Sequence, residues 1–123
     1  MLVRKCPCGS GAVYDTCCGR FHRGSERPAT AEELMRSRYS AFVMNEPDYL
    51  FTTWHPRTRP DRVTLDDPTE WTGLEILDVV AGGPEDDEGV VEFVARYEGG
   101  QLHERSRFAR RAGRWMYVDG DVG

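Results

Sequence analysis

Between residues 30 and 54, apolar positions recur at the three- and four-residue spacing of helices. Thr30 and Glu33 form a capping box, which predicts that a helix begins at residue 31. An apolar face suited to packing on a core is supplied by Leu34, Met35, Tyr39, Phe42 and Val43. Pro47 ends this helix or opens a second short one, because a helix accepts proline in its first turn. The Pro- and Asp-rich residues 56–70 are expected to form an extended loop.

From residue 71 onward the apolar period changes to two, which predicts β-strands. Four strands are expected, over residues 71–80, 90–98, 101–110 and 114–118. The second strand has one apolar face, made by Val91, Phe93, Ala95 and Tyr97. Turns are expected at residues 81–84, 99–100 and 112–113, where glycine recurs. Helices followed by a meander of strands indicate an α+β domain, with helices packed on one face of a curved antiparallel sheet.

Size and composition restrict the class of protein. A chain of 123 residues is one ordinary domain with room for a small appendage. No apolar run approaches the roughly 20 residues that cross a bilayer, and residues 1–5 lack the apolar stretch of a secretory signal. We therefore expect a cytoplasmic protein without a membrane partner. A reducing compartment disfavours structural disulfides.

The net charge of −5 is unevenly distributed. It is +3 over residues 1–40, −10 over residues 41–98 and +2 over residues 99–123. The acidic run at residues 85–88 is expected to be a solvated hairpin loop. The mildly basic N-terminal third leaves nucleic-acid binding as a weakly supported alternative.

Four cysteines in the first eighteen residues have the spacing of a metal site. Cys6, Cys8, Cys17 and Cys18 could complete a closed tetrahedral Zn²⁺ shell, which would be structural. So short a segment buries too little apolar surface to fold alone, so the metal would supply its folding free energy.

Three alternatives stay open for the cysteines. They could form disulfides, or one of the closely spaced pairs could be redox-active. Within the zinc interpretation, the adjacent Cys17 and Cys18 can both be ligands only if the turn that carries them is distorted. His22 could then replace one of them, although four cysteines are the preferred set.

Residues 6–19 resemble the SEC-C motif, the zinc knuckle at the C-terminus of the SecA translocation ATPase. The resemblance includes the Cys-Pro-Cys-Gly-Ser-Gly opening, Tyr14 and the paired final ligands, here Cys-Cys where many such motifs have Cys-His. The rest of the chain resembles the bacterial YchJ-like family in the segments Thr30–Phe42, Tyr49-Leu50 with Thr53–Pro56, Val91–Tyr97 and His103–Phe108. This resemblance implies a knuckle over residues 1–22 and a nuclear-transport-factor-2-like (NTF2-like) domain over residues 23–123, in which helices and a bent sheet enclose a conical pocket.

Polar residues that could line such a pocket, together with one tryptophan, are Arg38, Tyr39, Trp54, His55, Glu104 and Ser106. Strand alternation places Glu104 and Ser106 toward the core and His103 outward. Glu104 is either a general base or one half of a buried ion pair with Arg38 or His55. The remaining large aromatic residues, expected in the core, are Trp71, Trp115 and Tyr117.

Two functions fit these features. The first is a non-enzymatic, zinc-binding adaptor whose knuckle contacts a protein, ribosome or chaperone partner and whose pocket binds a small ligand. The second is a small-molecule enzyme with Glu104, His55, Arg38 and Tyr39 as candidate catalytic residues. No nucleophile elbow, phosphate loop or dinucleotide fingerprint occurs, which favours the first. Homodimers are common among domains of this fold, so a homodimer is a further expectation.

Overall fold

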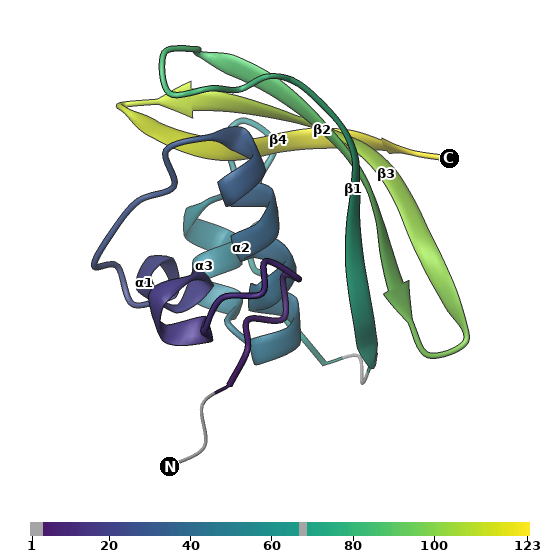
Figure 1. The fold of residues 1–123 in the computed structure, drawn as a ribbon. Helices are drawn as coiled ribbons and strands as arrows, with labels where there is room; N and C mark the ends of the chain where they lie inside the picture. Colours follow the sequence, from purple (N-terminus) through teal and green to yellow (C-terminus); the bar gives the residue numbers. More distant parts are fainter. Residues whose placement is uncertain (1–3, 67–68) are drawn as a thin grey trace.

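A curved four-stranded sheet wraps around one side of the longest helix in the computed structural model, which describes residues 4–66 and 69–123 (Figure 1). The helices are η1 (Tyr14–Thr16, a 3₁₀ turn), α1 (Cys18–His22), α2 (Ala31–Met44) and α3 (Pro47–Thr52). The strands are β1 (Trp71–Ala81), β2 (Glu88–Tyr97), β3 (Gly100–Arg111) and β4 (Arg114–Val122). They pair antiparallel in the order β1-β2-β3-β4. The expected α+β architecture is confirmed.

Two expectations fall partly outside the described residues. Residues 1–3 of the predicted knuckle and residues 67–68 of the predicted extended loop are not described. The described part of that loop, residues 56–66, contains neither helix nor strand. Among the described residues, no helix is both long and apolar enough to cross a bilayer.

Helix α2 begins and ends at local signals in the sequence. The Thr30 side chain accepts a hydrogen bond from the Glu33 N–H at 3.1 Å, as the capping box predicts. Glu33 reaches one residue further back than expected, and its carboxylate accepts from the N–H of Ala29 at 2.9 Å. Asn45 ends the helix in the left-handed conformation, with φ of 59°. Pro47 then opens α3, one of the two outcomes expected for it.

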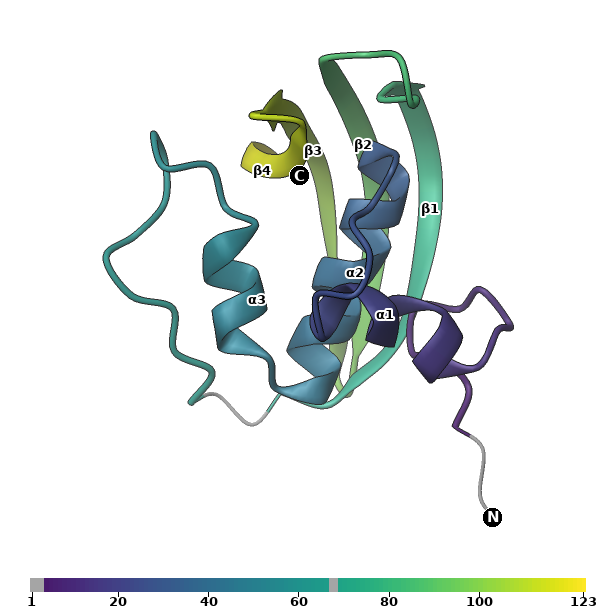
Figure 2. The same ribbon diagram turned by 90° about the vertical axis from the view of Figure 1, so that its left-hand side faces the viewer.

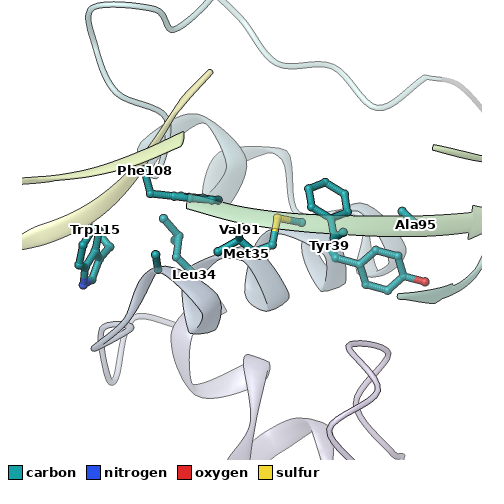
Figure 3. Close-up of a cluster of buried hydrophobic side chains, with 9 residues drawn as sticks. Leu34, Met35, Tyr39, Val91, Ala95, Phe108 and Trp115 are labelled. Atoms are coloured by element: carbon teal, nitrogen blue, oxygen red, sulfur yellow. The ribbon is translucent and has the colours of Figure 1, made fainter. Parts of the chain in front are cut away.

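The main core lies between α2 and the concave face of the sheet. Figure 3 shows Leu34, Met35 and Tyr39 of α2 directed toward the strands. Their partners on the sheet are Val91, Phe93, Ala95, Phe108 and Trp115, all buried. Phe42 was expected on the same face, but it is 40% exposed, because it lies near the end of α2 against Trp71 at the edge strand.

The N-terminus of α2 rests directly on the β1–β2 hairpin. The Ala31 N–H donates to the carbonyl of Gly82 at 2.9 Å. A Cβ atom on Gly82 would lie 2.7 Å from the Cβ of Ala31, and φ of Gly82 is +77°. A Cβ on Gly89 would lie 2.5 Å from the Cα of Gly82. Both positions therefore require glycine for close backbone approach.

Strand ends differ from expectation by one to four residues. The β2–β3 turn is Glu98-Gly99 rather than Gly99-Gly100, because Gly100 already pairs with Tyr97. Strand β4 continues to Val122, four residues further than expected. Its polar end is held by β3, where Arg107 forms ion pairs with Asp119 and Asp121.

The outer face of the sheet carries charged side chains paired with one another. Arg105 contacts Asp78 at 3.2 Å and Glu92 at 2.8 Å, and Glu92 also contacts His103 at 2.6 Å. His103 thus points outward, as predicted. The acidic residues 85–88 are exposed in the β1–β2 hairpin loop and at the first residue of β2, also as predicted.

Candidate metal centre and the adjoining pocket

The four cysteines gather at one point although they come from two separate segments. The sulfur atoms of Cys6, Cys8, Cys17 and Cys18 all lie within 4.8 Å of one another, and the Cys8 and Cys17 sulfurs are 3.7 Å apart. Zn–S bonds of about 2.3 Å in a tetrahedron place sulfurs about 3.8 Å apart. No disulfide joins them, and all but Cys17 are buried. The donor set therefore fits a thiophilic metal ion.

The proximity of the thiols changes their acidity. Hydrogen bonds from Cys18 and Cys8 hold the pKa of Cys6 well below its ordinary range. The pKa of Cys18, which hydrogen-bonds to Cys6 and Cys8, is raised in return. Because only thiolates ligate, a metal ion bound here would displace the protons of these thiols.

Adjacent cysteines both reach the cluster because the helix is broken between them. The 3₁₀ turn η1 ends at Thr16, Cys17 has φ of −111° and ψ of −112°, and α1 begins at Cys18. This is the distortion that two adjacent ligands require. Gly19 allows the turn to close, since a Cβ there would lie 2.7 Å from the carbonyl oxygen of Tyr14.

His22 is not a fourth ligand, because both of its ring nitrogens are engaged elsewhere. Nδ1 lies 2.6 Å from the hydroxyl of Tyr14, and Nε2 lies 2.8 Å from the backbone carbonyl of Ser37. A carbonyl only accepts, so Nε2 carries the proton and Nδ1 accepts from Tyr14. His22 therefore fastens the knuckle to α2. His22 is the last residue of α1, and Phe21 before it is buried.

The knuckle lies beside α2 (Figure 2), and several polar contacts join the two. The sulfur of Cys6 lies 3.5 Å from Oγ of Ser40. Arg36 donates to the carbonyl of Cys8 at 2.7 Å. Ser37 and Ser40 are fully buried, and their small side chains permit this close approach. The cysteine cluster and the core of the main domain therefore both pack against α2.

A pocket of about 260 Å³ lies on another side of α2. Its lining includes five of the six residues expected there, Arg38, Tyr39, Trp54, Glu104 and Ser106. The remaining lining residues are Met35, Phe42, Trp71, Phe93, Ala95, Leu102 and Tyr117. Trp71 and Tyr117 were expected in the core. They are half-buried, pack against it and form pocket wall, whereas Trp115 is buried as predicted.

His55 lies outside the pocket lining, contrary to expectation. Its backbone N–H donates to the carbonyl of Tyr117, and the N–H of Tyr117 donates to the carbonyl of Thr53, both at 2.8 Å. This short parallel bridge joins the end of α3 to β4 and places Trp54 against the Tyr117 ring. The His55 ring instead accepts from the N–H of Arg57 at 3.1 Å.

Arg38 is a buried cation in the pocket wall. It is 5% exposed, and its Nη1 donates to the carbonyl of Leu50 at 2.9 Å and to the hydroxyl of Thr53 at 2.7 Å. The guanidinium also lies over the Tyr117 ring, 4.7 Å from its centroid. Burial lowers the pKa of Arg38 to about 10, so it remains charged at neutral pH.

Glu104 points inward, as strand alternation predicts, but forms no ion pair with Arg38 or His55 among the described residues. Its Oε2 accepts from the hydroxyls of Ser106 at 2.6 Å and Tyr117 at 3.2 Å. Burial, followed by the nearby carboxylate, raises the pKa of Tyr117 to about 12, so its hydroxyl remains a donor. Gly120 makes room for this carboxylate, because a Cβ there would overlap it.

A second hollow, of about 400 Å³, lies between the knuckle, α3 and β4. Its lining includes Phe21, His22, Tyr49 and Trp115. The first pocket is the better ligand site, because it combines an aromatic wall with a buried charge.

Comparison with known proteins identifies both parts of the chain. The SEC-C motif matches residues 5–20, and the family described as YchJ, middle NTF2-like domain, matches residues 30–120. UPF0225 protein SCO1677 of Streptomyces coelicolor is 57% identical over 98% of this chain and 98% of its own length. A UPF0225 protein of Streptomyces avermitilis is 55% identical over 94% of this chain and 83% of its own. The predicted boundary between residues 22 and 23 stays a prediction.

Two solved structures share the fold. The solution structure of RPA3114, a SEC-C motif containing protein from Rhodopseudomonas palustris, has a TM-score of 0.83 and 35% identity, covering 96% of this chain and 98% of that one. The crystal structure of a SEC-C motif containing protein from Psychrobacter arcticus has a TM-score of 0.78 and 29% identity. The match covers 96% of this chain and 82% of that one. The chain therefore belongs to the YchJ-like UPF0225 family, with a SEC-C motif followed by an NTF2-like domain.

Proposed function

We propose that this protein is a non-enzymatic binding protein in which a structural zinc site braces the helix that forms one wall of a small-ligand pocket. The observation that supports this most strongly is the two-sided use of α2. Glu33, Arg36, Ser37 and Ser40 contact the knuckle, and Met35, Arg38, Tyr39 and Phe42 line the pocket. At 3.6 residues per turn these sets occupy opposite faces of one helix.

Zinc is the proposed metal because four thiolates in a closed, largely buried shell are typical of structural zinc sites. The shell leaves no position for substrate, so the ion would contribute folding free energy rather than chemistry. Loss of the ion would release Cys6 and Cys8 from their places beside Ser40 and Arg36, and so remove support from α2.

Metal analysis tests the zinc site. Protein purified without chelators or a metal-affinity column should contain close to one zinc per chain, and Cys8→Ser should contain none. Chelation of the wild type should lower its melting temperature and expose four reactive thiols. A protein without metal whose thiols react freely at the outset would overturn the proposed zinc site.

A docking role for the knuckle is a second candidate. It is favoured by the exposure of residues 9–13, a glycine-rich loop that ends in the 37%-exposed Val13. Cysteine variants would disturb α2 as well, so a surface variant is the sharper probe. A partner held by this loop should be captured by wild type and by Val122→Glu, which changes an exposed valine at the other end of the chain, but not by Val13→Glu.

A small-molecule enzyme that uses the pocket is the remaining alternative. Its proposed acid–base group is Glu104, which lines the pocket beside Ser106 and Tyr117. His55 no longer fits this scheme, because it lies outside the lining. Without a second titratable partner at neutral pH in the described lining, a binding role is favoured over acid–base catalysis.

A further inference from the structure

We propose that the pocket binds a small aromatic monocarboxylate, with its carboxylate on the guanidinium of Arg38 and its ring among the aromatic walls. This proposal rests on the small-ligand function proposed above and assigns the chemical class of the ligand.

The first argument is the state of Arg38. Both acceptors of its Nη1, the Leu50 carbonyl and the Thr53 hydroxyl, are neutral, and no hydrogen bond from Nε or Nη2 occurs within the described part of the chain. No carboxylate of the described residues forms an ion pair with it. A buried guanidinium is costly without a partner. Its planar fork of donors matches a carboxylate, which can accept two parallel hydrogen bonds.

The second argument is the remaining wall, which is largely aromatic. Its aromatic members are Tyr39, Phe42, Trp54, Trp71, Phe93 and Tyr117. Trp71 lies edge-on to Tyr39, with ring centroids 6.1 Å apart, and 6.0 Å from Phe42. Such walls favour a flat apolar body that packs edge-to-face or offset. The volume of about 260 Å³ is slightly below the usual range for ligand pockets, which favours a ligand with a single ring.

The third argument sets the orientation and the charge of the ligand. Glu104 provides a carboxylate on the sheet side of the same pocket, held by Ser106 and Tyr117 through Oε2. It would repel a second anionic group but accept a hydrogen bond from a hydroxyl. A monocarboxylate with a neutral or hydroxylated far end therefore fits, whereas a dicarboxylate does not.

Binding to the zinc-loaded full chain tests the proposal with four probes: benzoate, 4-hydroxybenzoate, benzamide and terephthalate. Calorimetry gives the affinities, and NMR signals of the Trp54 and Trp71 indoles report occupancy of this pocket, because both residues line it. We expect 4-hydroxybenzoate and benzoate to bind at least about tenfold more tightly than benzamide, the worth of one charge-assisted hydrogen bond. Terephthalate should bind more weakly than benzoate.

Substitutions in the pocket test whether the probes bind there. Arg38→Met should weaken benzoate binding at least about tenfold and leave benzamide unchanged. Arg38 also donates to the Leu50 carbonyl of α3, so Arg38→Met could disturb the fold. Two further variants therefore test the site without changing Arg38. Glu104→Gln should improve terephthalate binding, and Ala95→Phe should fill the pocket and abolish binding of every probe. Arg107→Gln, on the outer face, is the control and should bind as wild type does.

The outcomes separate the two proposals. Equal binding of benzamide and benzoate in the pocket would overturn the anion assignment while leaving a small-ligand function intact. If no probe binds, the aromatic carboxylate proposal is wrong, whereas the zinc site is judged by metal analysis alone. Benzoate binding that survives Ala95→Phe would place the ligand elsewhere and overturn the proposal.

Discussion

Oγ of Ser40 lies 3.5 Å from the sulfur of Cys6, so a helix of the main domain provides a polar neighbour for a candidate metal ligand. Because Ser40 is fully buried, this contact exists only while the knuckle stays packed on α2. The knuckle is therefore not an independent module on a flexible tether. The cysteine cluster contacts α2, and the same helix forms one wall of the pocket.

Removing a buried cysteine should weaken both the knuckle and the pocket. Cys8 is completely buried and its carbonyl accepts from Arg36. Cys8→Ser should lose the metal and lower the free energy of unfolding by about 2–3 kcal/mol, since loss of a metal is among the larger single-site effects. Chemical denaturation measures this. Ser10→Ala, which removes only an exposed hydroxyl 3.2 Å from the Cys17 sulfur, should keep the metal with about tenfold weaker affinity.

The attachment of the knuckle can be tested without touching the cysteines. His22→Ala removes the hydrogen bonds to Tyr14 and to the Ser37 carbonyl and should cost about 1–3 kcal/mol of stability. Metal content should remain one ion per chain, because His22 is not a ligand. His103→Ala is the matched control, since it removes two exposed contacts of an imidazole, the ion pair with Glu92 and the hydrogen bond to the Gly123 carbonyl, and should cost only about 0–1 kcal/mol. Loss of metal in His22→Ala would contradict the assignment of four cysteine ligands.

The close packing of the N-terminus of α2 on the β1–β2 hairpin predicts that a larger residue at Gly89 destabilises the fold. Gly89→Ala should lower the free energy of unfolding by about 1–3 kcal/mol, because its Cβ would lie 2.5 Å from the Cα of Gly82. Gly73→Ala is the control on the neighbouring strand. No atom lies within 4 Å of its added Cβ, so stability should change by no more than about 0.5 kcal/mol. Equal effects of the two substitutions would show that the close approach is absent.

Two histidines should titrate in opposite directions from the ordinary value of 6.5. Glu92 hydrogen-bonds to His103 and raises its pKa, whereas partial burial followed by the charges of Arg57 and Arg111 lowers that of His55. Because folding raises the pKa of His103, its protonation stabilises the fold at pH below 6.5. This contribution to stability is lost as the pH rises through the folded-state pKa. NMR titration should find His103 above His55, and Glu92→Gln should bring the pKa of His103 down. An unchanged value in this variant would contradict the ion pair.

The catalytic alternative is decided by Glu104. If the pocket is catalytic, Glu104→Gln abolishes turnover of a substrate and leaves the melting temperature nearly unchanged. For a binding protein we expect no turnover to lose and a cost of about 1–2 kcal/mol, since the amide replaces a charged acceptor of the Ser106 and Tyr117 hydroxyls. Thermal melting beside substrate screening separates these cases. Asp119→Asn, an exposed carboxylate on the outer face, is the control.

Local features of the chain could be predicted because their signals lie close together in sequence. The spacing of Cys6 and Cys8 from Cys17 and Cys18 predicted that these cysteines cluster, and Thr30 and Glu33 predicted the start of α2. Alternation along β3 placed Glu104 inward, since successive side chains of a strand must point to opposite faces. These relationships depend on backbone geometry over a few residues.

Long-range contacts decided the rest. Whether His22 bound metal or helix depended on where the Ser37 carbonyl lay, and His55 was excluded from the pocket by a bridge between the end of α3 and β4. Arg38 was one of two candidate partners for the Glu104 carboxylate, yet its protein acceptors are Leu50 and Thr53. Periodicity assigns a residue to a face but does not identify what lies opposite. That choice is made when distant segments pack together and every buried polar group must find a partner.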